Sequence, residues 1–230
     1  MKIISKDSSN IDLKEKTKPL DLKSWVGTDE SCKGDYFGPL VVASVYVDYN
    51  SIKVLSDIGV KDSKKLSDKK AKQLAAEIKN NTVFNVVVIG NKKYNELYTK
   101  FNNLNKMLGW AHARAIENIL NKTDCEYVLA DKFADHKVIK SSLMAKGKEI
   151  KLEQRVRAED DIAVAAASIV ARAEFIYRLE KLSKQYSMNL PKGASKQVLE
   201  QARAFVEKFG QNELENIAKL HFKTTKQVLA

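Results

Sequence analysis

The sequence predicts an α/β fold, in which a mixed sheet is flanked by helices and followed by a helical C-terminal part. Two observations support this expectation: β-branched runs alternate with helical stretches from Trp25 onward, and glycine and proline are too few for a long linker. A length of 230 residues predicts a single domain with at most an appendage. Residues 1–23 are polar and lack sustained periodicity, so we expect a short N-terminal arm followed by one domain over residues 24–230.

Five apolar segments are expected to form the strands. Residues 40–47 are a β-branched run that follows the Gly38-Pro39 turn. Residues 83–89 are almost continuously apolar, which is typical of a strand buried on both faces. The other expected strands are residues 25–28, 127–130 and 149–156.

Three long helices are expected between and after these strands, over residues 68–79, 103–120 and 160–184. Ser67 can cap the first of them, because its hydroxyl can accept a hydrogen bond from a free backbone N–H. The second and third carry apolar residues at helical spacing. In the third these residues are largely alanine, and such small side chains let a helix approach a sheet closely.

Charge and cysteine content narrow the class of protein. Forty Lys and Arg against 29 Asp and Glu give a net charge of +11, which favours a polyanionic partner such as nucleic acid, an anionic membrane or a phosphorylated substrate. Two cysteines, Cys32 and Cys125, exclude a disulfide framework and indicate a reducing, cytoplasmic location. The longest apolar run, residues 162–171, is far below the ~18 residues of a membrane span, and no signal peptide is evident.

Acidic residues occur where expected strands end. Asp29 and Glu30 follow the first expected strand, and Asp131 directly follows the fourth. A third acidic group opens the alanine-rich helix: Glu159, Asp160 and Asp161. Each group alone has an ordinary explanation, as an acidic turn or as a cap that complements the helix dipole.

Taken together, these carboxylates indicate a chemistry. The three histidines are scattered, so no Cys/His cluster is available, and carboxylate oxygens suit hard cations such as Mg²⁺ or Mn²⁺. In a basic protein this combination favours two-metal phosphoryl chemistry on nucleic acid. The residues alone therefore predict a metal-dependent nuclease. The alternative is a non-catalytic basic protein that binds nucleic acid and uses its carboxylates as caps and for solubility.

Seven ordered motifs resemble those of type 2 ribonucleases H, specifically ribonuclease HIII. They are GTDESCKGDYFGPLVVASVYV (27–47), VKDSKKLSDKK (60–70), NKMLGWAHARAIENIL (105–120), LADKFA (129–134), RAEDDIAVAAASIVARAEF (157–175), LPKGAS (190–195) and AKLHF (218–222). The resemblance implies an RNase H-like fold and a catalytic domain over residues 24–230. It also implies cleavage of the RNA strand of RNA–DNA hybrids by two-metal-ion hydrolysis, which leaves 5′-phosphate and 3′-hydroxyl ends.

The same resemblance implies the catalytic, metal-binding residues. The family uses four acidic residues and two Mg²⁺ or Mn²⁺ ions per site. Carried over, the first three fall on Asp29, Glu30 and Asp131. The fourth falls on Glu159, with Asp161 as the fallback, because successive residues at a helix start point about 100° apart.

A loop beside the first two acids is expected to recognise RNA. In the family a Gly-Lys-Gly loop contacts the 2′-hydroxyls that DNA lacks. Here the loop reads Cys32-Lys33-Gly34, preceded by Ser31. Cysteine has a Cβ and resists positive φ. Either this position has an ordinary backbone conformation or the recognition of 2′-hydroxyls is altered.

Basic residues are expected to hold the phosphate backbone. The resemblance points to Ser63, Lys64 and Lys65, and the window of residues 61–79 has seven lysines against three acids. Such contacts give salt-dependent affinity without sequence specificity. His112, in an apolar helical stripe, is expected to be packed in the core or behind the site rather than to bind metal.

Two points distinguish this chain within the resemblance. Ribonucleases HIII commonly carry an N-terminal domain that resembles the TATA-box-binding protein. The roughly 25 residues before the first strand are too few for this domain, so we expect weaker binding of hybrids.

The neighbouring possibility is a ribonuclease HII, which also cuts at single ribonucleotides in DNA. The LPKGAS and AKLHF motifs and Asp35 after Gly34 favour HIII. No large apolar stripe is left unassigned, so we expect a monomer.

Overall fold

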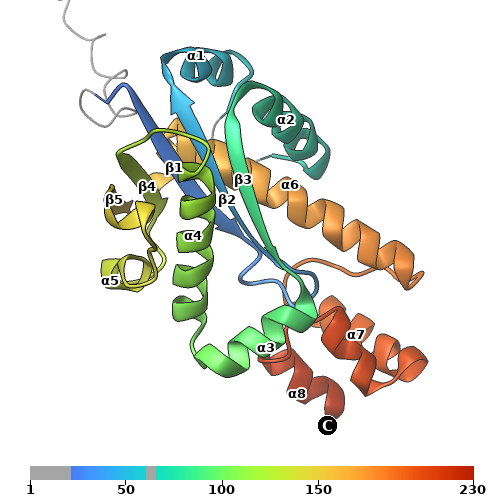
Figure 1. The fold of residues 1–230 in the computed structure, drawn as a ribbon. Helices are drawn as coiled ribbons and strands as arrows, with labels where there is room; N and C mark the ends of the chain where they lie inside the picture. The colour runs from blue at the N-terminus through green and yellow to red at the C-terminus, as the bar shows by residue number, and fades with distance from the viewer. Residues whose placement is uncertain (1–21, 61–65) are drawn as a thin grey trace, which may run out of the picture.

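A five-stranded mixed sheet lies at the centre of the computed structural model, which describes residues 22–60 and 66–230 (Figure 1). The strands are β1 (Ser24–Ser31), β2 (Leu40–Asp48), β3 (Val83–Ile89), β4 (Tyr127–Asp131) and β5 (Lys151–Arg155), in the spatial order β3-β2-β1-β4-β5. β2 pairs antiparallel with β1 and β3, whereas β1, β4 and β5 run parallel. The five expected strands and the mixed sheet are therefore confirmed.

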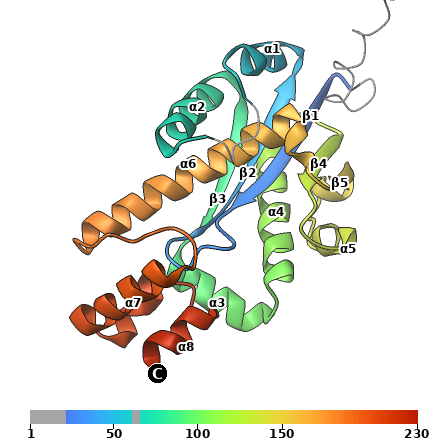
Figure 2. The ribbon, with the colours of Figure 1, turned by 180° about the vertical axis from the view of Figure 1, so that it is seen from behind.

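Helices cover both faces of this sheet. They are α1 (Tyr49–Asp57), α2 (Asp68–Asn81), α3 (Asn91–Phe101), α4 (Leu104–Leu120), α5 (His136–Lys140), α6 (Ile162–Gln185), α7 (Lys196–Phe209) and α8 (Lys223–Leu229), with the short 3₁₀ helices η2 (Lys146–Lys148), η3 (Ala158–Asp160) and η4 (Gln211–Asn216). α6 lies on one face and α4 on the other (Figures 1 and 2). Because side chains alternate along a strand, Val41 packs in the core under α6 and Val42 in the core under α4.

The alanine-rich helix approaches the sheet as closely as its sequence predicts. A Cβ added to Gly27 of β1 would lie 2.2 Å from backbone atoms of both Ala163 and Val164 in α6. Only glycine leaves room for this contact, and α6 is thereby held directly against β1. This packing brings the first turns of α6 next to the end of the strand that carries the first two acids.

The helix boundaries agree with the sequence at most ends. Ser67 caps α2, since its hydroxyl accepts a hydrogen bond from the N–H of Lys70. The alanine-rich helix begins at Ile162 rather than at Asp160, because residues 158–160 form the separate turn η3. Helices α1 and α3 were not among the expected elements.

The helical C-terminal part, α7 with η4 and α8, lies beside the connection between β1 and β2 (Figure 1). The N–H of Gly38 donates to the carbonyl of Ile217, and Phe37 pairs with Ala218 in an isolated antiparallel bridge. Among the helices of the described residues, none has the length and apolar character needed to cross a membrane.

Candidate active site

A cavity of about 330 Å³ opens where β1 and β4 end. The two strands are parallel, so their C-terminal ends meet at the same edge of the sheet, which is where sites in such sheets lie. The lining residues come from β1, the following loop, β4, η3 and α6: Asp29, Glu30, Ser31, Cys32, Lys33, Gly34, Asp131, Glu159, Ser168 and Arg172. The four acidic residues selected from the sequence and the four loop residues thus share one cavity.

The surroundings of Asp29 disfavour the ionised form of its carboxyl group. Burial raises the pKa of this carboxyl well above its usual value, and the charges of Glu30 and Asp131 raise it further. Hydrogen bonds from the Ser168 side chain and from the N–H of Glu30, which lies 2.8 Å from Oδ1, act in the opposite direction. The carboxylates at these strand ends therefore repel one another.

Glu30 is fixed in the ionised state by two bases. Burial alone would raise its pKa, but the hydrogen bond and charge of His112 and those of Lys33 lower the pKa to about 2. Nε2 of His112 lies 3.0 Å from Oε2, and Nζ of Lys33 lies 2.7 Å from Oε1. As adjacent residues of one strand, Glu30 and Asp29 face α4 and α6 respectively.

His112 is packed behind Glu30, as expected for a residue in the core or behind the site. Its ring is fully buried in α4, and Nδ1 lies 3.1 Å from the hydroxyl of Thr28. That hydroxyl also donates to the carbonyl of Ala43, 2.9 Å away, which links the ring to β2. The face of the ring stacks on Phe133 at 4.8 Å. The orientation of Glu30 is thus anchored in β1, β2 and α4.

The three acidic residues near the start of α6 have different surroundings. Glu159 lines the cavity, whereas Asp160 is exposed. Asp161 is fully buried and caps α6, accepting hydrogen bonds from the N–H groups of Ala163 and Val164 and from the indole of Trp25. Asp161 is therefore a structural cap, and the fallback position for the fourth carboxylate lies outside the cavity.

A backbone hydrogen bond joins the turn that carries Glu159 to the end of β4. Oδ1 of Asp131 accepts it from the N–H of Ala158 at 3.0 Å. Within the described residues, no three histidine, cysteine, aspartate or glutamate side chains converge closely enough to enclose a metal ion. The carboxylates thus line a shared wall rather than form a closed cage.

The loop after β1 keeps a conformation that usually requires glycine. Cys32 has a φ of 73°, which excludes the first of the two alternatives for this position, an ordinary backbone conformation. For a residue with a Cβ, this left-handed conformation costs about 1–2 kcal/mol. Burial also raises the pKa of the Cys32 thiol far above its ordinary value, with the nearby charge of Asp35 adding to the shift. A thiol in this state is a poor nucleophile, which argues against a redox role.

Sequence reasoning missed two lining residues, Ser168 and Arg172, which lie one turn apart on α6. The sequence does contain a signal for them: they are two polar residues, four positions apart, in a helix whose other residues in this region are apolar and predicted to be buried. The Arg172 guanidinium donates to the carbonyl of Leu66 at 2.8 Å and to Asp68 at 3.1 Å. The expected phosphate-contacting residues Ser63, Lys64 and Lys65 lie outside the described residues.

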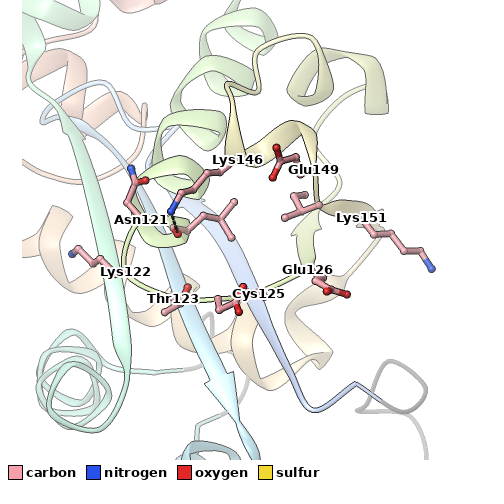
Figure 3. A pocket seen from close by; sticks show the side chains of 11 residues that line it. Asn121, Lys122, Thr123, Cys125, Glu126, Lys146, Glu149 and Lys151 are labelled. Atoms are coloured by element: carbon pink, nitrogen blue, oxygen red, sulfur yellow. Dashed lines mark hydrogen bonds between the residues drawn. The ribbon is translucent and has the colours of Figure 1, made fainter.

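A second cavity, of about 740 Å³, lies at the opposite end of β4 (Figure 3). Its wall mixes three lysines with three acids, Lys122, Lys146, Lys151, Asp124, Glu126 and Glu149. Lys146 donates to the carbonyl of Leu120 at 3.0 Å and so caps the last turn of α4. This larger cavity lies away from the strand ends that carry the paired acids.

Comparison with known proteins decides the family. The sequence model described as Ribonuclease HII matches residues 26–225. The chain belongs to this family. Within the ribonuclease HII family, ribonuclease HIII of Protochlamydia amoebophila is 47% identical over 213 residues, which cover 93% of this chain and 71% of that protein. The motif resemblance to type 2 ribonucleases H is therefore confirmed.

Solved structures of ribonucleases HIII share the fold. Bst-RNase HIII in complex with Mn²⁺ matches with a TM-score of 0.84 and 35% identity, covering 90% of this chain and 69% of that chain. Aquifex aeolicus RNase H3 matches with a TM-score of 0.73 and 32% identity, covering 87% and 73% respectively. The RNase H-like architecture expected from the motifs is thus confirmed, and family membership makes the chain a ribonuclease H-type hydrolase.

Proposed function

We propose that this chain is an endoribonuclease that cleaves the RNA strand of RNA–DNA hybrids, with Asp29, Glu30, Asp131 and Glu159 as its catalytic residues. One observation carries the proposal: carboxylates from β1, β4 and η3, remote in sequence, line one cavity at the strand ends. The net charge of +11 supports a polyanionic substrate. The relatives named ribonuclease HIII support the choice of a hybrid.

The donor set suits divalent cations, and we propose two Mg²⁺ or Mn²⁺ ions. Its four carboxylates supply only oxygen, and a cation would stabilise the charge of Asp29 that burial and the neighbouring carboxylates disfavour. Mg²⁺ in such sites is commonly held by one or two carboxylates together with substrate phosphates, so a closed cage of protein ligands is not required. When bound, the ions would activate a water and stabilise the departing 3′ oxygen, giving 5′-phosphate and 3′-hydroxyl ends.

The residues around the carboxylates keep them in place for this reaction. The Ser168 side chain hydrogen-bonds to Asp29, and His112 and Lys33 hold Glu30. The N–H of Ala158 holds Asp131. Such contacts orient metal ligands before the cation arrives, which lowers the reorganisation needed for catalysis.

Substrate recognition is assigned to the loop and to the basic side chains. The left-handed turn at Cys32 lets the backbone of residues 31–34 approach the minor groove, where 2′-hydroxyls distinguish RNA from DNA. Ser63, Lys64 and Lys65 would contact phosphates, and Arg172 adds a basic side chain to the cavity wall. These phosphate contacts predict binding that weakens as salt rises.

The proposed setting is a monomer in the cytoplasm. Large exposed hydrophobic side chains of the described residues are scattered over separate parts of the fold: Tyr49, Val83, Val156, Tyr177 and Leu229. A scattered distribution of this kind does not form an interface. Cys32 and Cys125 are both free thiols, which fits a reducing compartment.

A substrate panel tests the proposal. The protein is incubated with Mg²⁺ or Mn²⁺ and an RNA–DNA hybrid, an all-DNA duplex, an all-RNA duplex, or a DNA duplex with one ribonucleotide. We expect cleavage of the hybrid's RNA strand with ligatable 5′-phosphate ends. Efficient cleavage at the single ribonucleotide would instead indicate activity of the ribonuclease HII kind, and cleavage of none of the duplexes would contradict the proposal.

A further inference from the structure

The residues that immediately follow the recognition loop are clamped by the C-terminal part of the chain. Gly193, between α6 and α7, makes two backbone contacts with them: its N–H donates to Oδ1 of Asp35 at 2.6 Å, and its carbonyl accepts from the N–H of Tyr36 at 2.9 Å. One end of segment 35–38 is thus tied to a glycine more than 150 residues away in sequence.

Residues 217–219 hold the same segment from a second side. The carbonyl of Ile217 accepts from the N–H of Gly38, and the N–H of Lys219 donates to the carbonyl of Tyr36, each at 2.9 Å. These bonds accompany the antiparallel bridge between Phe37 and Ala218. The backbone of segment 35–38 is therefore held mainly by the C-terminal region, and the Asn91 side chain of α3 also donates to the carbonyl of Gly38 at 2.8 Å.

The side chain of Lys219 closes this clamp. It is fully buried, and its Nζ donates to the carbonyls of Asp35 and Gly38, both at 2.7 Å. The same amine lies 5.6 Å from the centre of the Tyr94 ring. A buried ammonium is expensive unless it is hydrogen-bonded, and here it draws together the carbonyls at the two ends of a four-residue segment.

We propose that Lys219 is a positioning residue for substrate recognition: through segment 35–38 it holds the loop of residues 31–34, in which Cys32 has the left-handed conformation. A non-glycine residue at positive φ, such as Cys32, persists only where its surroundings impose the conformation, and the Lys219 clamp is the neighbouring structure that does so. The inference gives the C-terminal LPKGAS and AKLHF motifs a shared role. It rests on the proposed function, since the recognition task of the loop belongs to that proposal.

The test uses Lys219→Met, which keeps the chain length and removes the amine. The matched control is Phe205→Leu, because Phe205 is buried in α7 against Tyr186 and Phe209 and lies outside the clamp. Gly193→Ala is the second clamp variant, since Gly193 has a φ of 84° and open space around its Cβ position. It weakens the clamp through the backbone if Lys219→Met does not fold.

Cysteine alkylation gives a readout that does not depend on cleavage. The alkylation rates of Cys32 and Cys125 are followed separately by peptide mass spectrometry in each full-length variant. Because the charge of Lys219 lowers the pKa of the Cys32 thiol, loss of the amine by itself would slow alkylation, so a faster reaction would report a released loop. We expect Cys32 to react about tenfold faster in Gly193→Ala, which keeps that charge, and also faster in Lys219→Met, with Cys125 unchanged in both. Equal acceleration of both thiols, or the same Cys32 rate as in Phe205→Leu, would overturn the inference.

Kinetics supply the second readout. In Lys219→Met we expect KM for the hybrid to rise about tenfold with kcat changed less than about threefold, while Phe205→Leu leaves both near the wild-type values. A fall in kcat at constant KM would overturn the inference. If the wild type cleaves no hybrid, the proposed function fails, and the thiol comparison still decides whether Lys219 holds the loop.

Discussion

Nε2 of His112 lies 3.0 Å from Oε2 of Glu30, and the two residues are 82 positions apart in sequence. The contact places a buried imidazole of α4 behind a carboxylate of β1 and, with Nζ of Lys33 at 2.7 Å from the other oxygen, Oε1, fixes the orientation of the Glu30 carboxylate. Residues that support a metal ligand in this way commonly contribute 10–100-fold to metal affinity or activity.

Replacing His112 by leucine should therefore loosen Glu30 without unfolding the core. We expect a loss of about 10–100-fold in kcat or in Mn²⁺ affinity, because Glu30 loses its oriented partner. Steady-state cleavage assays measure kcat. The rise in Tm with increasing Mn²⁺ concentration measures the affinity for Mn²⁺. Thr28→Val, which removes only the anchor of the ring, should give a smaller loss of the same kind. Unchanged metal dependence in His112→Leu would contradict this role.

The fourth carboxylate can be identified by separating activity from stability. Glu159→Gln should lower kcat strongly with little change in Tm, since this side chain lines the cavity. Asp161→Ala should instead lower stability by about 1 kcal/mol or more through loss of the α6 cap, with activity per folded molecule retained. Asp160→Asn, at an exposed position, should change neither property. A reversed pattern between Glu159 and Asp161 would move the fourth ligand to Asp161.

The left-handed turn at Cys32 predicts which residues the loop accepts. Glycine adopts a φ near 73° without strain, so Cys32→Gly should keep kcat/KM for the hybrid within about threefold. A β-branched side chain is a genuine outlier at positive φ, so Cys32→Val should lower kcat/KM at least about tenfold. Steady-state kinetics on a labelled hybrid measure both. Equal activity of the valine and glycine variants would show that the turn is not needed.

His221 predicts a pH dependence of stability. Its ring is stacked on Tyr98 at 4.1 Å, and burial together with the charge of Lys219 lowers its pKa to about 4 from an ordinary value near 6.5. The unfolded chain therefore binds more protons between these values, and the free energy of unfolding falls as pH falls from about 6.5 to about 4. His221→Phe should flatten this part of the profile in denaturant titrations. An identical slope in both proteins would contradict the assignment.

Strands and long helices could be predicted because each carries a periodic signal. Buried positions appear in the sequence as apolar residues at strand or helix spacing. This holds for the apolar runs of β2 and β3 and for the alanines of α6. α1 was missed although Asp48 and Ser51 form a capping box at its start, because the helix has only nine residues. A helix as short as α1 has too few turns for its apolar spacing to be recognised in the sequence.

The site was predictable only in part, for a related reason. Asp29, Glu30 and Asp131 stand at strand ends, where sequence patterning identifies them. The roles of His112 and Ser168 depend on which helix lies over which face of the sheet, and strand order is not visible in the chain. Motif resemblance alone likewise left two candidates at the start of α6, and the burial of Asp161 separates it from Glu159.

The central claim is that the carboxylates at the ends of β1 and β4 perform metal-dependent cleavage, and Asp29→Asn tests it most directly. Hybrid binding and cleavage are measured side by side, with Mg²⁺ or Mn²⁺, for this variant and the wild type. We expect the variant to bind the hybrid as well as the wild type and to cut it at least about 1,000-fold more slowly, since it lacks one anionic ligand. A variant that cuts at the wild-type rate, or a wild type inactive with either cation, would contradict the account.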